Sequence, residues 1–174
     1  PLMGKPPIRV NRAPVLALWA ATVAERLGHP PETAMSLASA IAGIAARAKA
    51  RRLGSADDGS MTREGEAGSV VLLGHEVPVT HDPEGRICAA EPDGTPAPGT
   101  PAGNYVRRAF GDRLEEVRAA MQRVAESYPP DELNRAGLRI YESFRPLRPE
   151  GTGGRGAKEV LDLALMTPRE EGER

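Results

Sequence analysis

Aromatic residues are scarce in this 174-residue chain, making up only 3% of it, so Leu, Val, Ile and Ala must build the core. A single cysteine, Cys88, excludes an intrachain disulfide and favours a reducing compartment. The sequence also lacks an apolar run of about 18 residues, the length that a membrane-spanning helix needs. Its first seven residues lack the apolar stretch of a signal peptide. We therefore expect a cytoplasmic protein with no membrane partner.

The chain also lacks a strong charge of either sign, since its formal net charge is −1. A general polyanion-binding protein is usually strongly basic, so any contact with nucleic acid must come from a local patch. Lysine is nearly absent, at 3 of the 23 basic residues, and arginine supplies the remainder. Glycine and proline are abundant instead, at 19 and 17, and they belong in loops because both weaken helix and strand interiors.

Apolar residues recur every three to four positions in two stretches near the N-terminus, which predicts a helical hairpin over residues 8–54. Pro14 is suited to the first turn of the first helix, and Gly28 ends that helix. The second helix begins near Pro31 and ends at Gly54. Small residues on both helices favour a close approach of the helix axes. The same faces also suit a homodimer.

The turn of this hairpin resembles the helix-turn-helix of DNA-binding proteins, with glycine in a short connection. In such a motif the second helix reads the DNA. Here it would present a set poorly suited to phosphates or bases, namely Glu32, Thr33, Met35 and Ser36. A plain αα-hairpin explains the same residues, and we favour it.

The middle of the chain consists of three segments that differ in composition. Residues 55–68 have no periodicity and many small or charged residues, which predicts a flexible loop. Residues 69–90 hold short β-prone runs separated by Gly and Asp-Pro, which predicts a small β-hairpin or meander. Residues 91–103 contain four prolines and three glycines, which predicts a Pro/Gly-rich loop.

Helical periodicity resumes over residues 104–166 and predicts a second helical pair followed by a short C-terminal helix that includes Val160 and Leu161. We expect residues 167–174 to be a disordered tail. The predicted fold is a single mainly α domain over residues 1–174. It has two helical pairs, a short C-terminal helix, and a small β-hairpin or meander in the middle.

Basic residues crowd the end of the second predicted helix, at Arg47, Lys49, Arg51 and Arg52. Such a cluster can bind phosphates, and Arg9 and Arg12 would extend it if the N-terminus lies nearby. Cations at this position also match the negative end of the helix dipole. A solvated helix end therefore explains the cluster as well.

A glycine-rich stretch near the C-terminus is the best candidate ligand site in the sequence. A glycine turn that leads into a helix can offer backbone N–H groups to an anion. The predicted anion-binding residues here are Arg145, Arg148, Gly153, Gly154, Arg155 and Lys158. The stretch is not a Walker A loop, because Ala157 stands where lysine is needed and Glu159 where serine or threonine is needed. A purely structural turn is the alternative.

Two histidines and two carboxylates lie within eight residues, at His75, Glu76, His81 and Asp82. They would form a metal site if a hairpin brought them together, although the spacing matches no established zinc pattern. Nothing in the local sequence activates Cys88 as a nucleophile.

Three motifs stand out at the two ends of the chain. They are Arg9-Val10-Asn11-Arg12-Ala13-Pro14-Val15-Leu16 with Leu18-Trp19-Ala20, the run Ala40-Ile41-Ala42-Gly43, and Tyr141-Glu142-Ser143-Phe144-Arg145-Pro146 continuing through Gly151 to Lys158. Together these motifs resemble a family of uncharacterised bacterial proteins. The resemblance covers about half of the chain and not its middle. Members of that family often place an aromatic residue where this chain has Arg155. The resemblance implies no activity.

These observations predict a non-enzymatic cytoplasmic binding or regulatory protein without a cofactor. Its expected partner is nucleic acid or another phosphate-bearing ligand, which would contact the arginine patches. One alternative is a protein–protein interaction module or homodimer. Another is a metal-dependent enzyme at His75 and His81.

Overall fold

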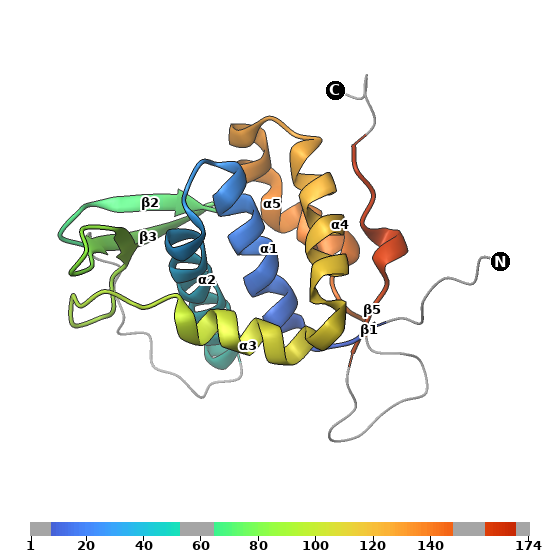
Figure 1. The fold of residues 1–174 in the computed structure, drawn as a ribbon, viewed down its shortest axis with the longest axis horizontal. Coiled ribbons are helices and arrows are strands. Elements are labelled where there is room, and N and C mark those ends of the chain that lie inside the picture. The colour runs from blue at the N-terminus through green and yellow to red at the C-terminus, as the bar shows by residue number, and fades with distance from the viewer. Residues whose placement is uncertain (1–7, 53–64, 148–158, 170–174) are drawn as a thin grey trace.

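The computed structural model describes residues 8–52, 65–147 and 159–169 (Figure 1). The described chain is mainly helical, with a small antiparallel sheet and a separate pair of short strands, so the predicted fold class is confirmed. The helices are α1 (Arg12–Arg26), α2 (Pro31–Arg52), α3 (Thr100–Phe110), α4 (Leu114–Glu126) and α5 (Pro130–Phe144). The strands are β1 (Ile8–Arg9), β2 (Ser69–Leu72), β3 (His75–His81), β4 (Ile87–Ala89) and β5 (Val160–Leu161). None of the described helices is both long and apolar enough to cross a membrane.

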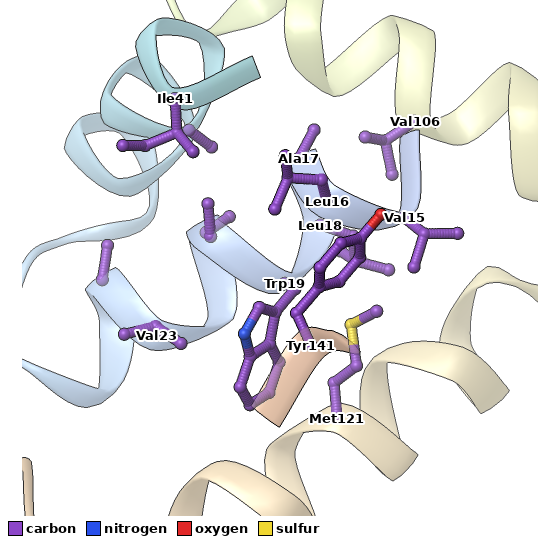
Figure 2. Close-up of a cluster of buried hydrophobic side chains, with 14 of the residues drawn as sticks. Val15, Leu16, Ala17, Leu18, Trp19, Val23, Ile41, Val106, Met121 and Tyr141 are labelled. Carbon is purple, nitrogen blue, oxygen red and sulfur yellow. The ribbon is translucent and has the colours of Figure 1, made fainter. Parts of the chain in front are cut away.

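Helix α1 is the centre of the molecule. Every residue from Pro14 to Ala24 is buried, and α2, α3, α4 and α5 all contact the helix. Figure 2 shows side chains from these four helices, Ile41, Val106, Met121 and Tyr141, around those of α1. The sequence predicted one apolar face, but a helix that is apolar or small on all sides is buried on all sides.

The short connection between α1 and α2 forms the predicted hairpin. Gly28 adopts a φ of 105°, a backbone conformation that favours glycine, and the N–H of His29 bonds to the carbonyl of Ala24 (3.1 Å). At the start of α2, Thr33 and Ser36 are buried against the region of β4. A DNA-reading role for these two side chains is therefore excluded, in agreement with the plain αα-hairpin.

The sheet has the order β2-β3-β4, and all its pairs are antiparallel. Leu73 and Gly74 connect β2 to β3 with φ values of 54° and 80°, as in a two-residue type I′ hairpin turn. The side chain of Asn134 on α5 pairs with the outer edge of β2. Its Oδ1 accepts from the N–H of Leu73 (2.7 Å) and its Nδ2 donates to the carbonyl of Val71 (2.8 Å). This contact fixes the sheet to the helical layer.

Trp19, Gly137 and Leu73 meet where α1, α5 and the β2–β3 turn come together. Trp19 is completely buried, and its Nε1–H donates to the carbonyl oxygen of Gly137 (2.9 Å). The ring of Phe144 packs edge-on against the indole, with centroids 5.2 Å apart. A Cβ at position 137 would collide with Cδ2 of Leu73. Any larger residue at position 137 would therefore force the end of the Leu73 side chain to move.

The two ends of the described chain pair with each other. Strand β1 runs antiparallel to β5, and the N–H of Val10 bonds to the carbonyl of Glu159 (2.9 Å). On its other side, Val160 exchanges two backbone hydrogen bonds with Leu147 (3.0 and 2.9 Å). The assignment of Val160 and Leu161 to a final helix was wrong, because this pairing overrides the local periodicity. Only Leu163–Leu165 is helical there, as a single 3₁₀ turn.

Three boundaries also differ from the sequence-based segments. Helix α3 starts at Thr100, inside the predicted 91–103 loop, because Pro101 is tolerated in a first helical turn. Residues 65–68, assigned to the flexible loop, form a turn that hydrogen-bonds to Val79. Arg169, assigned to the disordered tail, stacks over the ring of Tyr128 at 4.7 Å.

Candidate anion-binding end of the molecule

Arginines from separate parts of the chain gather at one end of the molecule. Since α1 and α2 form a hairpin, the start of α1 lies at the same end as the finish of α2. Figure 1 shows the end of α2, helix α3 and the β1–β5 pair along the lower edge of the view. We call this region the basic end. Its described arginines are Arg9, Arg12, Arg47, Arg107, Arg108 and Arg145.

Helix α3 forms the middle of the basic end. Its residue Val106 is buried beside Val15 of α1 (Figure 2), so its last turns lie next to the first turns of α1. Arg107 and Arg108 are exposed on the outer side, and Arg107 donates to the side-chain oxygen of Asn104. Among the described residues, neither arginine forms an ion pair with a carboxylate. Both match the helix dipole, but both also remain available to an anion.

Arg12 is held more firmly than the α3 arginines. Its Nε lies 3.0 Å from the carbonyl oxygen of Pro146 and 3.0 Å from Oε2 of Glu159. The guanidinium therefore ties the start of α1 to the segment after α5 and to the residue before β5. Its side chain is still 43% exposed, which leaves part of the guanidinium open to solvent.

The buried hydroxyl of Tyr141 lies among these charges. It donates a long hydrogen bond (3.4 Å) to the carbonyl of Arg12. Burial raises the pKa of Tyr141 to about 12, while Arg12 and Arg145 act to lower it and Glu159 to raise it further. All three charged groups therefore act on the same phenol, which places Arg145 with Arg12 at the basic end.

The structure places part of the predicted site. Arg47 is exposed and Arg145 is half-buried, whereas Arg51 and Arg52 belong to the last turn of α2. The remaining predicted residues, Arg148, Gly153, Gly154, Arg155 and Lys158, lie outside the described residues. Leu147 and Val160 are joined by two backbone hydrogen bonds. The described residues on the two sides of this gap therefore lie side by side at the basic end.

Sequence reasoning missed the contribution of α3, and it grouped Arg9 and Arg12 with the α2 arginines alone. One signal in the sequence did indicate that this region is basic. Residues 94–111 contain no acidic residue, although the whole chain has 24 acidic residues against 23 basic ones. An acid-free stretch that contains Arg107 and Arg108 indicates a basic surface wherever it folds.

The metal site lacks the geometry it needs. His75 begins β3 and His81 ends it, so six residue steps of extended strand separate them by about 20 Å. His81 instead contacts Oε2 of Glu66 (3.2 Å), and Asp82 pairs with Arg86 (2.8 Å). The part of the chain that the structure describes contains no group of three or more His, Cys, Asp or Glu arranged to hold a metal.

Cys88 does not have the properties of a nucleophile. It is buried in β4, and burial raises the pKa of its thiol. The carboxylate of Asp82, 3.8 Å from Sγ, raises that pKa further. The thiol form is therefore favoured over the reactive thiolate.

A shallow groove of about 240 Å³ lies between α4 and α5. Its lining includes Val124, Ile140 and Phe144, with Thr167 from the segment after β5. Glu132, which also lines the groove, forms an ion pair with Arg169 (2.5 Å).

Most of the small residues that suggested a homodimer are buried within the chain. Ala20, Ala24 and Ala38 are completely buried and are not available to a second copy. Ala42 and Gly43 of α2 are half-buried.

Comparisons with protein-family models, with curated proteins and with solved structures found no match. The functional proposal therefore rests on the residues of the basic end.

Proposed function

We propose that this protein is a non-enzymatic binding or regulatory protein that contacts nucleic acid through its basic end. The observation that carries the proposal is that the start of α1, the end of α2, the last turns of α3 and the β1–β5 pair come together at one end of the molecule. These segments carry or adjoin Arg9, Arg12, Arg47, Arg107, Arg108 and Arg145. Guanidinium groups suit phosphates because they are always charged and donate in a planar fork. The single cysteine suits a reducing compartment, and we place the protein in the cytoplasm.

The overall charge explains why the binding would be local. With a net charge of −1, the whole molecule has little general attraction for a polyanion. Within the basic end, the carboxylate of Glu159 is already paired with Arg12, whereas Arg9, Arg47, Arg107 and Arg108 pair with no described carboxylate. A phosphate backbone would supply the missing negative charge and release counterions as it binds.

Electrophoretic mobility or fluorescence anisotropy with duplex and single-stranded oligonucleotides tests this proposal, over salt concentrations from about 50 to 200 mM. We expect log Kobs to fall linearly with the logarithm of salt concentration. The double variant Arg9→Gln/Arg47→Gln should bind more weakly and show a shallower slope.

The matched control is Arg123→Gln/Arg135→Gln, which removes the same charge from the end of α4 and the start of α5. It should keep most of the wild-type slope. Absence of binding, binding independent of salt, or equal weakening in the two double variants would remove the basic end as the site.

A further inference from the structure

We infer that the nucleic acid bound at the basic end is single-stranded, and that Tyr105 of α3 stacks against its bases. This inference rests on the proposed function of the same surface. One exposed aromatic ring, in a chain with few aromatic residues, is the feature on which it depends.

Tyr105 differs from every other aromatic residue in this protein. The chain has one Trp, three Tyr and two Phe, and the structure describes all six. Four of them are buried, and Tyr128 is half-buried beneath the guanidinium of Arg169. Tyr105 alone is exposed, with 41% of its surface open to solvent. The core therefore does not account for this ring.

Helix α3 holds the ring outward. Its buried face consists of Gly103, Val106 and Phe110, which pack toward α1 and its neighbours. Tyr105 falls on the opposite face, where Arg108 follows it by three positions and is its neighbour on the helix surface. The first turns of α3 pack against the start of α2 at Met35, and Figure 1 shows α3 running from there along the lower edge of the view toward the β1–β5 pair. The exposed ring thus shares a helix face with Arg108, and the last turns of α3 lie next to the start of α1, which carries Arg12.

An exposed aromatic ring among arginines matches the chemistry of single-strand recognition. The arginines follow the phosphates while the ring stacks on a base, and stacking tolerates any sequence because every base has a π-face. A duplex buries those faces between its base pairs, so it can use the arginines but not Tyr105. The acid-free stretch 94–111 keeps carboxylates of α3 itself away from such a strand.

The test compares a fluorescein-labelled oligo(dT) 20-mer with a duplex of the same length by anisotropy at fixed salt. Tyr105→Ala should weaken single-strand binding by about 5- to 160-fold, the range expected when one base–aromatic stack is removed. It should change duplex binding by less than about twofold. Tyr105→Phe keeps the ring and should bind the single strand like the wild type. Val71→Ala, which shortens an exposed apolar residue on β2, is the control and should alter neither affinity.

The outcomes separate this inference from the function on which it rests. Salt-dependent binding of both oligonucleotides that is unaffected by Tyr105→Ala would overturn the stacking role and leave the arginine surface in place. Equal weakening of single strand and duplex would also overturn it, since that result indicates a general change in the surface. Failure of the wild type to bind either oligonucleotide would overturn both.

Discussion

Helices α1 and α3 lie against each other but use their residues in different ways. In α1, eleven consecutive residues from Pro14 to Ala24 are buried, and neighbouring elements explain each of them. In α3, only Gly103, Val106 and Phe110 are buried, and the outer face displays Tyr105 with Arg108, while Arg107 is exposed at the side of the helix. Packing accounts for the central eleven residues of α1 and for only one face of α3.

This difference separates residues that maintain the fold from residues that are available for function. A buried residue is constrained by the atoms around it, because protein interiors are densely packed. An exposed residue without a partner is constrained by stability only weakly, and substitutions there usually change it by less than about 0.5 kcal/mol. Substitutions around α1 should therefore change stability, whereas those on the outer face of α3 should change binding.

The largest expected effect on stability is at Trp19. Trp19→Ala removes a completely buried indole and its hydrogen bond to Gly137, so we expect the unfolding free energy to fall by about 3–5 kcal/mol. Denaturant titration followed by far-UV circular dichroism measures it. Tyr105→Ala is the aromatic control on α3 and should cost less than about 0.5 kcal/mol. Similar destabilisation in the two variants would contradict the division between the helices.

A smaller effect is expected at Gly137. In Gly137→Ala the new methyl group meets the buried side chain of Leu73, and overpacking of this kind costs about 1–3 kcal/mol. Gly43→Ala is the matched control in α2, because its new Cβ meets only Nη1 of Arg47, at 3.4 Å. That control should be neutral or gain up to about 1 kcal/mol from better helix propensity. A stabilised Gly137→Ala would show that the packing of Trp19, Gly137 and Leu73 tolerates expansion.

The same contrast explains what sequence alone could predict. The hairpin followed from local signals, since Gly28 ends α1 and apolar residues recur through both helices. The strand formed by Val160 and Leu161 did not, because it depends on backbone partners at Arg9 and Leu147 far away in the sequence. Local periodicity carries no information about such a partner.

The candidate site was predictable to a similar extent. Arg47 and Arg145 stood out through their charge and the residues around them. That they share one end of the molecule with Arg107 and Arg108 depends on how α3 packs against α1 and α2. Tyr105 looked ordinary in the sequence, and only the burial of the other aromatic residues distinguishes it.

Tyr141 lies where the core meets the basic end, and the titration of its hydroxyl tests that placement. Its pKa is raised from 10.0 to about 12 in the fold, so the folded state favours the neutral phenol. The stability that this provides is complete below about pH 10 and disappears as the pH rises from 10 to 12. Tyr141→Phe should lack this alkaline destabilisation and should be less stable by at most about 1 kcal/mol at neutral pH, where only the 3.4 Å hydrogen bond is removed.

Absorbance at 295 nm during an alkaline titration checks the assignment. The wild type should show a tyrosinate step near pH 12 that Tyr141→Phe lacks. If every tyrosine of the wild type titrates near pH 10, the hydroxyl of Tyr141 is not buried among Arg12, Arg145 and Glu159.

The smallest expected change in stability, and the most informative one for function, is on the outer face of α3. Arg107→Gln/Arg108→Gln should alter the unfolding free energy by less than about 0.5 kcal/mol, because neither guanidinium pairs with a described carboxylate. For each phosphate that the variant no longer neutralises, the slope of log Kobs against log salt should become shallower by about 0.9 for a duplex and 0.7 for a single strand. Arg123→Gln/Arg135→Gln, on α4 and α5, should leave that slope unchanged. A double variant of α3 that is destabilised but keeps its salt slope would make these arginines part of the fold, and α3 would then resemble α1 after all.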